Sequence, residues 1–289
     1  MGYEKVAANL GIVHKQIADL KIKLDPNAQI VQQLSLVREY LAEKDLLSVD
    51  EHDKKWKDRF LEFYKAQLAV GILSEAIAEL VTNQKEPLAK YLKVVLAGNL
   101  TQGGPAGGQP RDWFYELWLA SILSKAGFTV RLQEPDLVVE GNGLSQEIGI
   151  ACKYPSSDKG IHDHLSKGLS QLKKHGLSGF IALGIDQIVV EKANLKKFVD
   201  FNQGDKHPID VLQAHANSEA HTLVKERPTK YPSEDPVDAL LVTLSLAGHY
   251  GQPPQLVAPT VFSIHCPKQH QLRKDMEVIV AALEKLQGR

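Results

Sequence analysis

The stretch that decides the fold of the C-terminal part of the chain is EPDLVVEGNGLSQEIGIACK, residues 134 to 153. Apolar residues lie on both sides of Gly141-Asn142-Gly143, and this pattern is typical of a β-hairpin. It predicts two antiparallel strands, Asp136 to Glu140 and Leu144 to Lys153. Antiparallel neighbours bring the start of the first strand and the end of the second to the same edge of a sheet.

Alternation along the second strand separates two sets of side chains. Gly149, Ala151 and Lys153 share one face with Ser145 and Glu147, because strand side chains alternate with a period of two. The other face is Gln146, Ile148, Ile150 and Cys152, so Cys152 is predicted to be a small core residue and not a nucleophile. Asp136 and Lys153 are expected on the exposed edge of the sheet.

The elements around this hairpin predict a mixed α/β (α+β) sheet flanked by helices. Apolar periodicity and runs of β-formers predict helices at 111–126, 160–175, 208–226 and from about 268, and strands at 128–132, 179–185, 239–246 and 260–266. The stretch 227–238, rich in proline and charge, is predicted to be a surface loop.

Segment 111–186 resembles the PD-(D/E)xK nuclease superfamily. The residues behind the resemblance are Glu116 in the first helix, Pro135-Asp136 at the start of one strand, Ala151-Cys152-Lys153 at the end of the next, and Gln171 in the following helix. The resemblance covers roughly a quarter of the chain. It implies a restriction-endonuclease-like fold over residues 111–289.

The resemblance also implies roles for single residues. Asp136 and Glu116 would hold Mg²⁺ or Mn²⁺, because hard cations prefer carboxylate oxygens. Lys153 would be the catalytic lysine, orienting the attacking water or stabilising developing charge. Lys167 and Gln171 would contact the nucleic-acid backbone. Asp136, Glu116 and Lys153 are therefore the expected catalytic residues.

The acidic residue that the family pattern places at position 151 is missing, because the chain has Ala151 there. Glu147 shares the expected face, but four strand residues span roughly 13 Å, which is too far for one metal site. Glu116 is the better substitute, and Glu134 is a weaker one. Full activity is therefore in question.

Each of these residues also has an ordinary structural interpretation. Glu116 can mark the solvent stripe of its helix, Asp136 can be a turn residue after proline, and Lys153 can be a solvent-facing lysine. Gln171 can be a solvated glutamine. Between Lys153 and His175 there are five lysines against two aspartates, a basic stretch that suits either phosphate contact or a solvated helix face.

Residues 1–99 are predicted to form an all-helical domain, followed by a Gly/Pro-rich linker at 100–110. A capping box at 48–51 is expected to open its third helix. The first helix is predicted to run to Leu24, with a heptad seam at Tyr3, Val6, Leu10, Val13, Ile17, Leu20 and Leu24. This seam favours self-association or partner binding, or tight packing against the other helices of the domain.

Composition excludes several classes of protein. The two cysteines, Cys152 and Cys266, argue against a disulfide framework and a cysteine-based zinc site. The N-terminus has neither a secretory signal nor an apolar run that could cross a membrane, so we expect a cytoplasmic protein. The formal net charge of −1 argues against nucleic-acid binding by bulk electrostatics, although a local basic groove remains compatible.

Two functions of different classes follow. The first is magnesium-dependent hydrolysis of phosphodiester bonds, with DNA as the expected partner. The second is a binding module: a nuclease fold that has lost hydrolysis and docks DNA or a protein. A third interpretation makes the helical domain the working part of an interaction protein. Defence or mobile-element biology would suit this architecture, by association alone.

Overall fold

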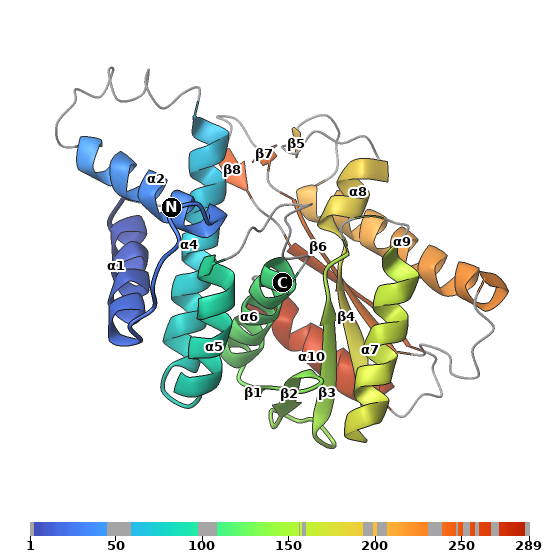
Figure 1. Cartoon of the computed structure of the whole chain (residues 1–289). Helices are drawn as coiled ribbons and strands as arrows, with labels where there is room; N and C mark the ends of the chain where they lie inside the picture. The colour runs from blue at the N-terminus through green and yellow to red at the C-terminus, as the bar shows by residue number, and fades with distance from the viewer. Residues whose placement is uncertain are drawn as a thin grey trace. The chain divides into compact units, whose positions relative to one another are not determined.

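The computed structural model describes most of the chain, which divides into two units, Met1–Lys125 and Ala126–Arg289 (Figure 1). The described residues are 3–44, 59–97, 109–155, 157, 160–192, 199–200, 207–230, 239–246, 248–250, 255–257, 260–266 and 272–286. None of the helices within these residues is long and apolar enough to cross a membrane.

The first unit is helical, as predicted. Its described helices are α1 (Tyr3–Asp19), α2 (Gln29–Lys44), α4 (Phe60–Leu80), α5 (Lys85–Ala97) and α6 (Gln109–Lys125). Helix α4 packs against α1, α2 and α6, and α5 packs against α6. The seam of α1 is buried at Val6, Leu10, Val13 and Ile17. The apolar face that suggested self-association is therefore covered within one chain at these four positions.

Helix α1 ends at Asp19, so the prediction that it runs to Leu24 is wrong. Lys21 adopts a positive φ of 51°. The amide of Lys21 donates to the carbonyl of Ala18, and the amide of Ile22 donates to that of Ile17, both at 3.0 Å. These two bonds form a Schellman motif, which usually contains glycine at the position that Lys21 occupies. The sequence therefore carried no glycine to signal the end.

Two further expectations concern the helical part. The capping box at 48–51 and residues 100–108 of the linker lie outside the described residues. Helix α6, which we expected to open the second domain from residue 111, starts at Gln109 and belongs to the first unit. Its apolar face supplies buried side chains at Leu117, Leu119 and Leu123, and it packs against α4 and α5.

The second unit contains a mixed six-stranded sheet in the order β1-β2-β3-β4-β6-β9. Its strands are β1 (Thr129–Gln133), β2 (Asp136–Glu140), β3 (Ile148–Lys153), β4 (Gly179–Gly184), β6 (Leu240–Ser245) and β9 (Thr260–His265). Strands β3, β4 and β6 run parallel, and the remaining pairs are antiparallel. The carboxyl ends of β3, β4 and β6 therefore lie at one edge of the sheet.

Helices cover both faces of this sheet, so the predicted α/β fold with a helical N-terminal region is confirmed (Figure 1). The helices are α7 (Ile161–His175), α8 (Asp186–Lys192), α9 (Pro208–Lys230) and α10 (Arg273–Leu286). One hydrophobic core joins α7, α8 and α9 to side chains that include Ala151, Ile181 and Val242. Met276, Ile279 and Leu283 of α10 are buried outside that core.

The hairpin differs from its prediction at the start of the second strand. Strand β3 begins at Ile148 and not at Leu144, because the connection after β2 is longer than a tight turn. Gly141, Asn142 and Gly143 all have positive φ, as the turn signal indicates. The amide and hydroxyl of Ser145 both donate to the carboxylate of Asp275 at 2.7 Å, which directs residues 144–147 toward α10.

Other elements match or extend the predictions. The prediction of a loop from residue 227 is wrong for residues 227–230, because helix α9 continues to Lys230, and the rest of the predicted loop, 231–238, lies outside the described residues. A second, three-stranded sheet in the order β5-β7-β8 was not predicted. Its strands are β5 (Val199–Asp200), β7 (Gly248–Tyr250) and β8 (Gln255–Val257).

Candidate active site

The hairpin places Asp136 and Lys153 at the same edge of the sheet. Strands β2 and β3 pair Leu137 with Ile150 and Val138 with Gly149. One residue further, this register sets Asp136 opposite Ala151, on the face that Lys153 shares. Asp136 begins β2 and Lys153 ends β3, so the two side chains meet where β3 ends.

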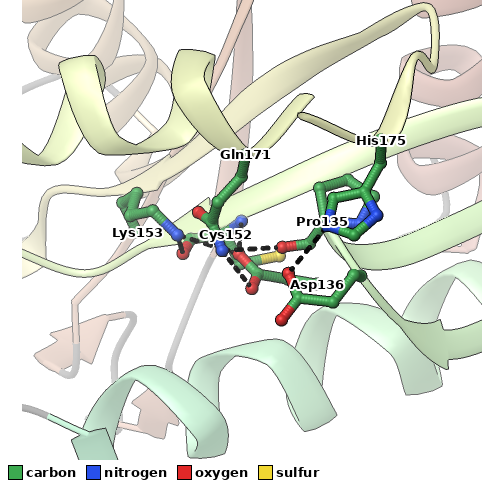
Figure 2. A network of polar contacts seen from close by, with 7 residues as sticks. Pro135, Asp136, Cys152, Lys153, Gln171 and His175 are labelled. Carbon is green, nitrogen blue, oxygen red and sulfur yellow. Dashed lines mark hydrogen bonds and ion pairs between the residues drawn. The ribbon is translucent and has the colours of Figure 1, made fainter. Parts of the chain in front are cut away.

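The carboxylate of Asp136 accepts hydrogen bonds on both oxygens (Figure 2). Its Oδ2 accepts from the backbone amide of Cys152 and from Nζ of Lys153, both at 2.8 Å. Its Oδ1 accepts from Nε2 of Gln171 at 3.0 Å. Donors from two neighbouring elements, β3 and α7, therefore fix this carboxylate of β2.

The pair formed by Asp136 and Lys153 is buried, contrary to our expectation of an exposed edge. The Lys153 and Asp136 side chains are 11% and 13% exposed. Helix α7 covers them, because it packs on the face of β3 and β4 that carries Ala151. The interpretations of Asp136 as an ordinary turn residue and of Lys153 as a solvent-facing lysine are therefore wrong. Removing either side chain would leave the charge of the other one buried without a partner.

Burial raises the pKa of the Asp136 carboxyl above its ordinary value. The charge of Lys153, its hydrogen bond, the Cys152 amide and Gln171 all act in the opposite direction. Loss of any one of these donors would therefore raise the pKa of Asp136 further.

Gln171 lies over the pair because α7 approaches the sheet closely one turn earlier. A Cβ built on Gly168 would lie 3.0 Å from the side chain of Ile181 and 3.4 Å from Cβ of Ala151. Nε2 of Gln171 also donates to the carbonyl of Pro135 at 2.9 Å. The solvated interpretation of Gln171 is thus wrong, since its amide binds the site itself.

The position of the missing acid is filled by protein. Ala151 is fully buried and belongs to the core beneath α7. Because Gly168 already lies close above it, a longer side chain has no free space at this position. Glu147, the other acid considered on this strand, precedes β3 and forms an ion pair at 2.6 Å with Arg131.

The remaining predicted site residues are distributed over both units. Glu116 is buried, with 3% of its surface exposed, on α6 of the first unit. Its convergence with Asp136 stays a prediction. Lys167 is exposed on α7, one turn before Gln171. Glu134, the weaker substitute, has its Oε2 3.7 Å from Nε2 of His175.

The oxygen atoms of the site are of the kind that can bind a hard cation. Nζ of Lys153 lies 2.8 Å from the carbonyl oxygen of Cys152 as well as from Asp136 Oδ2. Oε1 of Gln171 is buried and accepts no hydrogen bond from the described part of the chain. One carboxylate with neutral oxygens fits a magnesium ion that keeps several water ligands. Among the described residues, no three His, Cys, Asp or Glu side chains form a larger metal cluster.

A second group of polar residues at this edge was not predicted. Asp186 follows β4 and begins α8. Its Oδ2 accepts a hydrogen bond of 2.7 Å from the hydroxyl of Tyr154, and its Oδ1 accepts one from the amide of Ser245. The signal in the sequence that could have found Asp186 is its position just after a buried strand. The carboxyl ends of parallel strands often carry functional residues.

We compared the chain with protein-family models, with curated proteins and with solved structures, and none of these comparisons found a match.

Proposed function

We propose that this protein is a divalent-metal-dependent nuclease that hydrolyses phosphodiester bonds of DNA in the cytoplasm. The observation that carries the proposal is the buried pair of Asp136 and Lys153 at the ends of adjacent strands, with Gln171 bound to the same carboxylate. These are three of the residues behind the resemblance to PD-(D/E)xK nucleases. Their convergence supports the proposal, since the sequence separates them by up to 35 positions.

Each side chain has a role in this proposal. A bound Mg²⁺ or Mn²⁺ would polarise the phosphoryl oxygen and lower the pKa of an attacking water. Asp136 would supply the anionic ligand, and Glu116 is the proposed second one. Lys153 would stabilise charge that develops on the phosphate. Lys167 would contact the nucleic-acid backbone beside Gln171.

A binding module without hydrolysis is the second candidate, and Ala151 favours it. The position where the family pattern has an acid is core, closed by Gly168. Asp136 would then act without the acid that the family pattern places at position 151. Such a protein would use this fold to bind DNA or a protein partner without hydrolysing it.

Metal titration together with DNA cleavage separates these candidates. A nuclease should bind Mn²⁺ in calorimetry and cleave duplex DNA, and Asp136→Asn should weaken both. A binding module should retain DNA in a gel-shift assay at low salt, bind Mn²⁺ poorly and cleave nothing. DNA binding without cleavage by the wild-type protein would replace the first candidate with the second.

A further inference from the structure

The ends of three parallel strands are joined by one carboxylate outside the proposed catalytic set. Asp186 follows β4, and it accepts hydrogen bonds from Tyr154, which follows β3, and from Ser245, which ends β6. Strand β4 lies between β3 and β6. Asp186 therefore links its own strand end to both neighbours.

This link lies immediately beside the catalytic lysine. Lys153 is the last residue of β3, and the register pairs it with Leu183 of β4. Tyr154 is the next residue, and its hydroxyl donates a hydrogen bond to Asp186. This bond holds the chain just after the last paired residue of β3. Strand β4 is itself fixed to β6 there, because Ile185 donates to the carbonyl of Thr243 at 3.0 Å.

We propose that Asp186 is a positioning residue for Lys153, acting through Tyr154. The inference rests on the proposed function for its catalytic consequence. The amide of Cys152 and Nζ of Lys153 both bind Asp136 from the last two residues of β3. When Tyr154 is released, this strand end is free to fray, and both donors move away from Asp136.

The electrostatics of Asp186 agree with such a role. Burial raises its pKa to about 6, and the hydrogen bonds from Ser245 and Tyr154 oppose this shift. Asp186 is partly buried, and a carboxylate that loses hydration is costly unless its hydrogen bonds are made. The hydrogen bonds from Ser245 and Tyr154 therefore both stabilise the charged form of Asp186.

Four variants test the proposal. Tyr154→Phe removes one hydroxyl and keeps the ring, and Asp186→Ala removes both links. Asp186→Asn is the rescue variant, because its amide oxygen can accept from Ser245 while its NH₂ donates to the Tyr154 hydroxyl. Ser263→Ala is the matched control, since it removes a buried hydroxyl bond of 2.6 Å to Asn217 in the same unit, between β9 and α9.

The first readout is hydrogen exchange of the Cys152 amide, measured by NMR at pH 7 without metal or DNA. Tyr154→Phe and Asp186→Ala should speed this exchange at least about tenfold beyond any change in the slowest amides of the unit. Asp186→Asn should stay within a few-fold of wild type, and so should Ser263→Ala. This readout does not need nuclease activity, so it remains decisive if the proposed function fails.

The second readout is single-turnover DNA cleavage, which reports the catalytic consequence. Tyr154→Phe should lower the rate at saturating DNA about tenfold or more and leave the DNA concentration for half-maximal rate unchanged, because Lys153 acts in the transition state. Equal exchange at Cys152 in wild type and Tyr154→Phe overturns the proposal. So does an equal acceleration in Ser263→Ala, which would show general loosening of the unit.

Discussion

Nζ of Lys153 lies 2.8 Å from Oδ2 of Asp136, in a place where the two side chains are almost completely buried. The same ammonium group donates to the carbonyl of Cys152 at 2.8 Å. Lys153 thus binds two oxygens that would also attract a divalent cation. Lysine and metal are therefore expected to compete electrostatically for this site.

The first prediction follows from this competition. Lys153→Met should tighten Mn²⁺ binding about tenfold, or about 1.4 kcal/mol, because a neighbouring positive charge is removed while Asp136 remains. The same variant should lose cleavage. Isothermal titration calorimetry measures the affinity, and Lys174→Met, which changes an exposed lysine of α7, is the control. Weaker Mn²⁺ binding by Lys153→Met would show that the lysine does not compete with the metal.

The second prediction concerns the stability of the buried pair. Asp136→Asn and Lys153→Met should each lower the free energy of unfolding by about 3 kcal/mol, because each leaves a buried charge without its partner. The double variant should lose clearly less than the sum, with a coupling on the order of 2 kcal/mol. Urea denaturation measures all four proteins.

The more exposed pair of Arg131 and Glu140 provides a comparison cycle. The side chains of Arg131 and Glu140 are 34% and 44% exposed, and Nη1 of Arg131 lies 3.0 Å from Oε1 of Glu140. Removing both charges there should give a coupling of less than about 1 kcal/mol. If both cycles gave the same small coupling, the pair of Asp136 and Lys153 would be a surface ion pair in solution.

The third prediction concerns the missing acid. Ala151→Glu should destabilise the protein by at least about 3 kcal/mol, because it adds volume and charge to a filled core position beneath Gly168. Ala151→Gln has the same size without the charge and should cost less. Thermal and urea unfolding measure both variants. Wild-type stability of Ala151→Glu would show that position 151 opens into the site, as the family pattern implies.

The fourth prediction is a titration near pH 6. The carboxyl of Asp186 should titrate with a pKa of about 6, and Tyr154→Phe should raise this pKa because the anion loses a hydrogen bond. NMR of ¹³C-labelled aspartate measures it, and Asp186→Asn assigns the signal. A pKa near 4 in the wild type would show that this carboxyl keeps its hydration in the folded protein.

The same shift predicts how stability depends on pH. The folded state holds the proton of Asp186 up to about pH 6, whereas the unfolded state releases it near pH 4. Raising the pH through this window therefore removes stability from the wild type. Asp186→Asn should become more stable relative to the wild type between pH 4 and pH 7. Melting curves at the two pH values measure the difference.

The sequence predicted the parts of the site that depend on local pattern. Alternation in β3 and the turn signal at 141–143 were sufficient to bring Lys153 to Asp136. The hydrogen bond of Gln171 to Asp136 could not be predicted from local pattern, because it depends on how closely α7 approaches the sheet at Gly168. A glutamine on a polar helix face has the same pattern whether it binds solvent or a carboxylate.

Contacts between distant segments account for the other differences. Residues 144–147 have the alternation of a strand, but Ser145 binds Asp275, which lies 130 positions later. The link of Asp186 to Tyr154 and Ser245 joins three strand ends that share no sequence motif. Such pairings depend on the order of strands in the sheet, which local periodicity does not contain.

The most direct measurement of the central claim is cleavage of supercoiled plasmid and linear duplex DNA with Mg²⁺ or Mn²⁺. We predict that the wild-type protein cleaves, that EDTA stops the reaction, and that Asp136→Asn and Lys153→Ala each lower the rate at least about 100-fold. Lys174→Ala, a surface control on α7, should cleave like the wild type. No cleavage by the folded wild-type protein, or equal cleavage by Asp136→Asn and Lys153→Ala, would contradict the catalytic account.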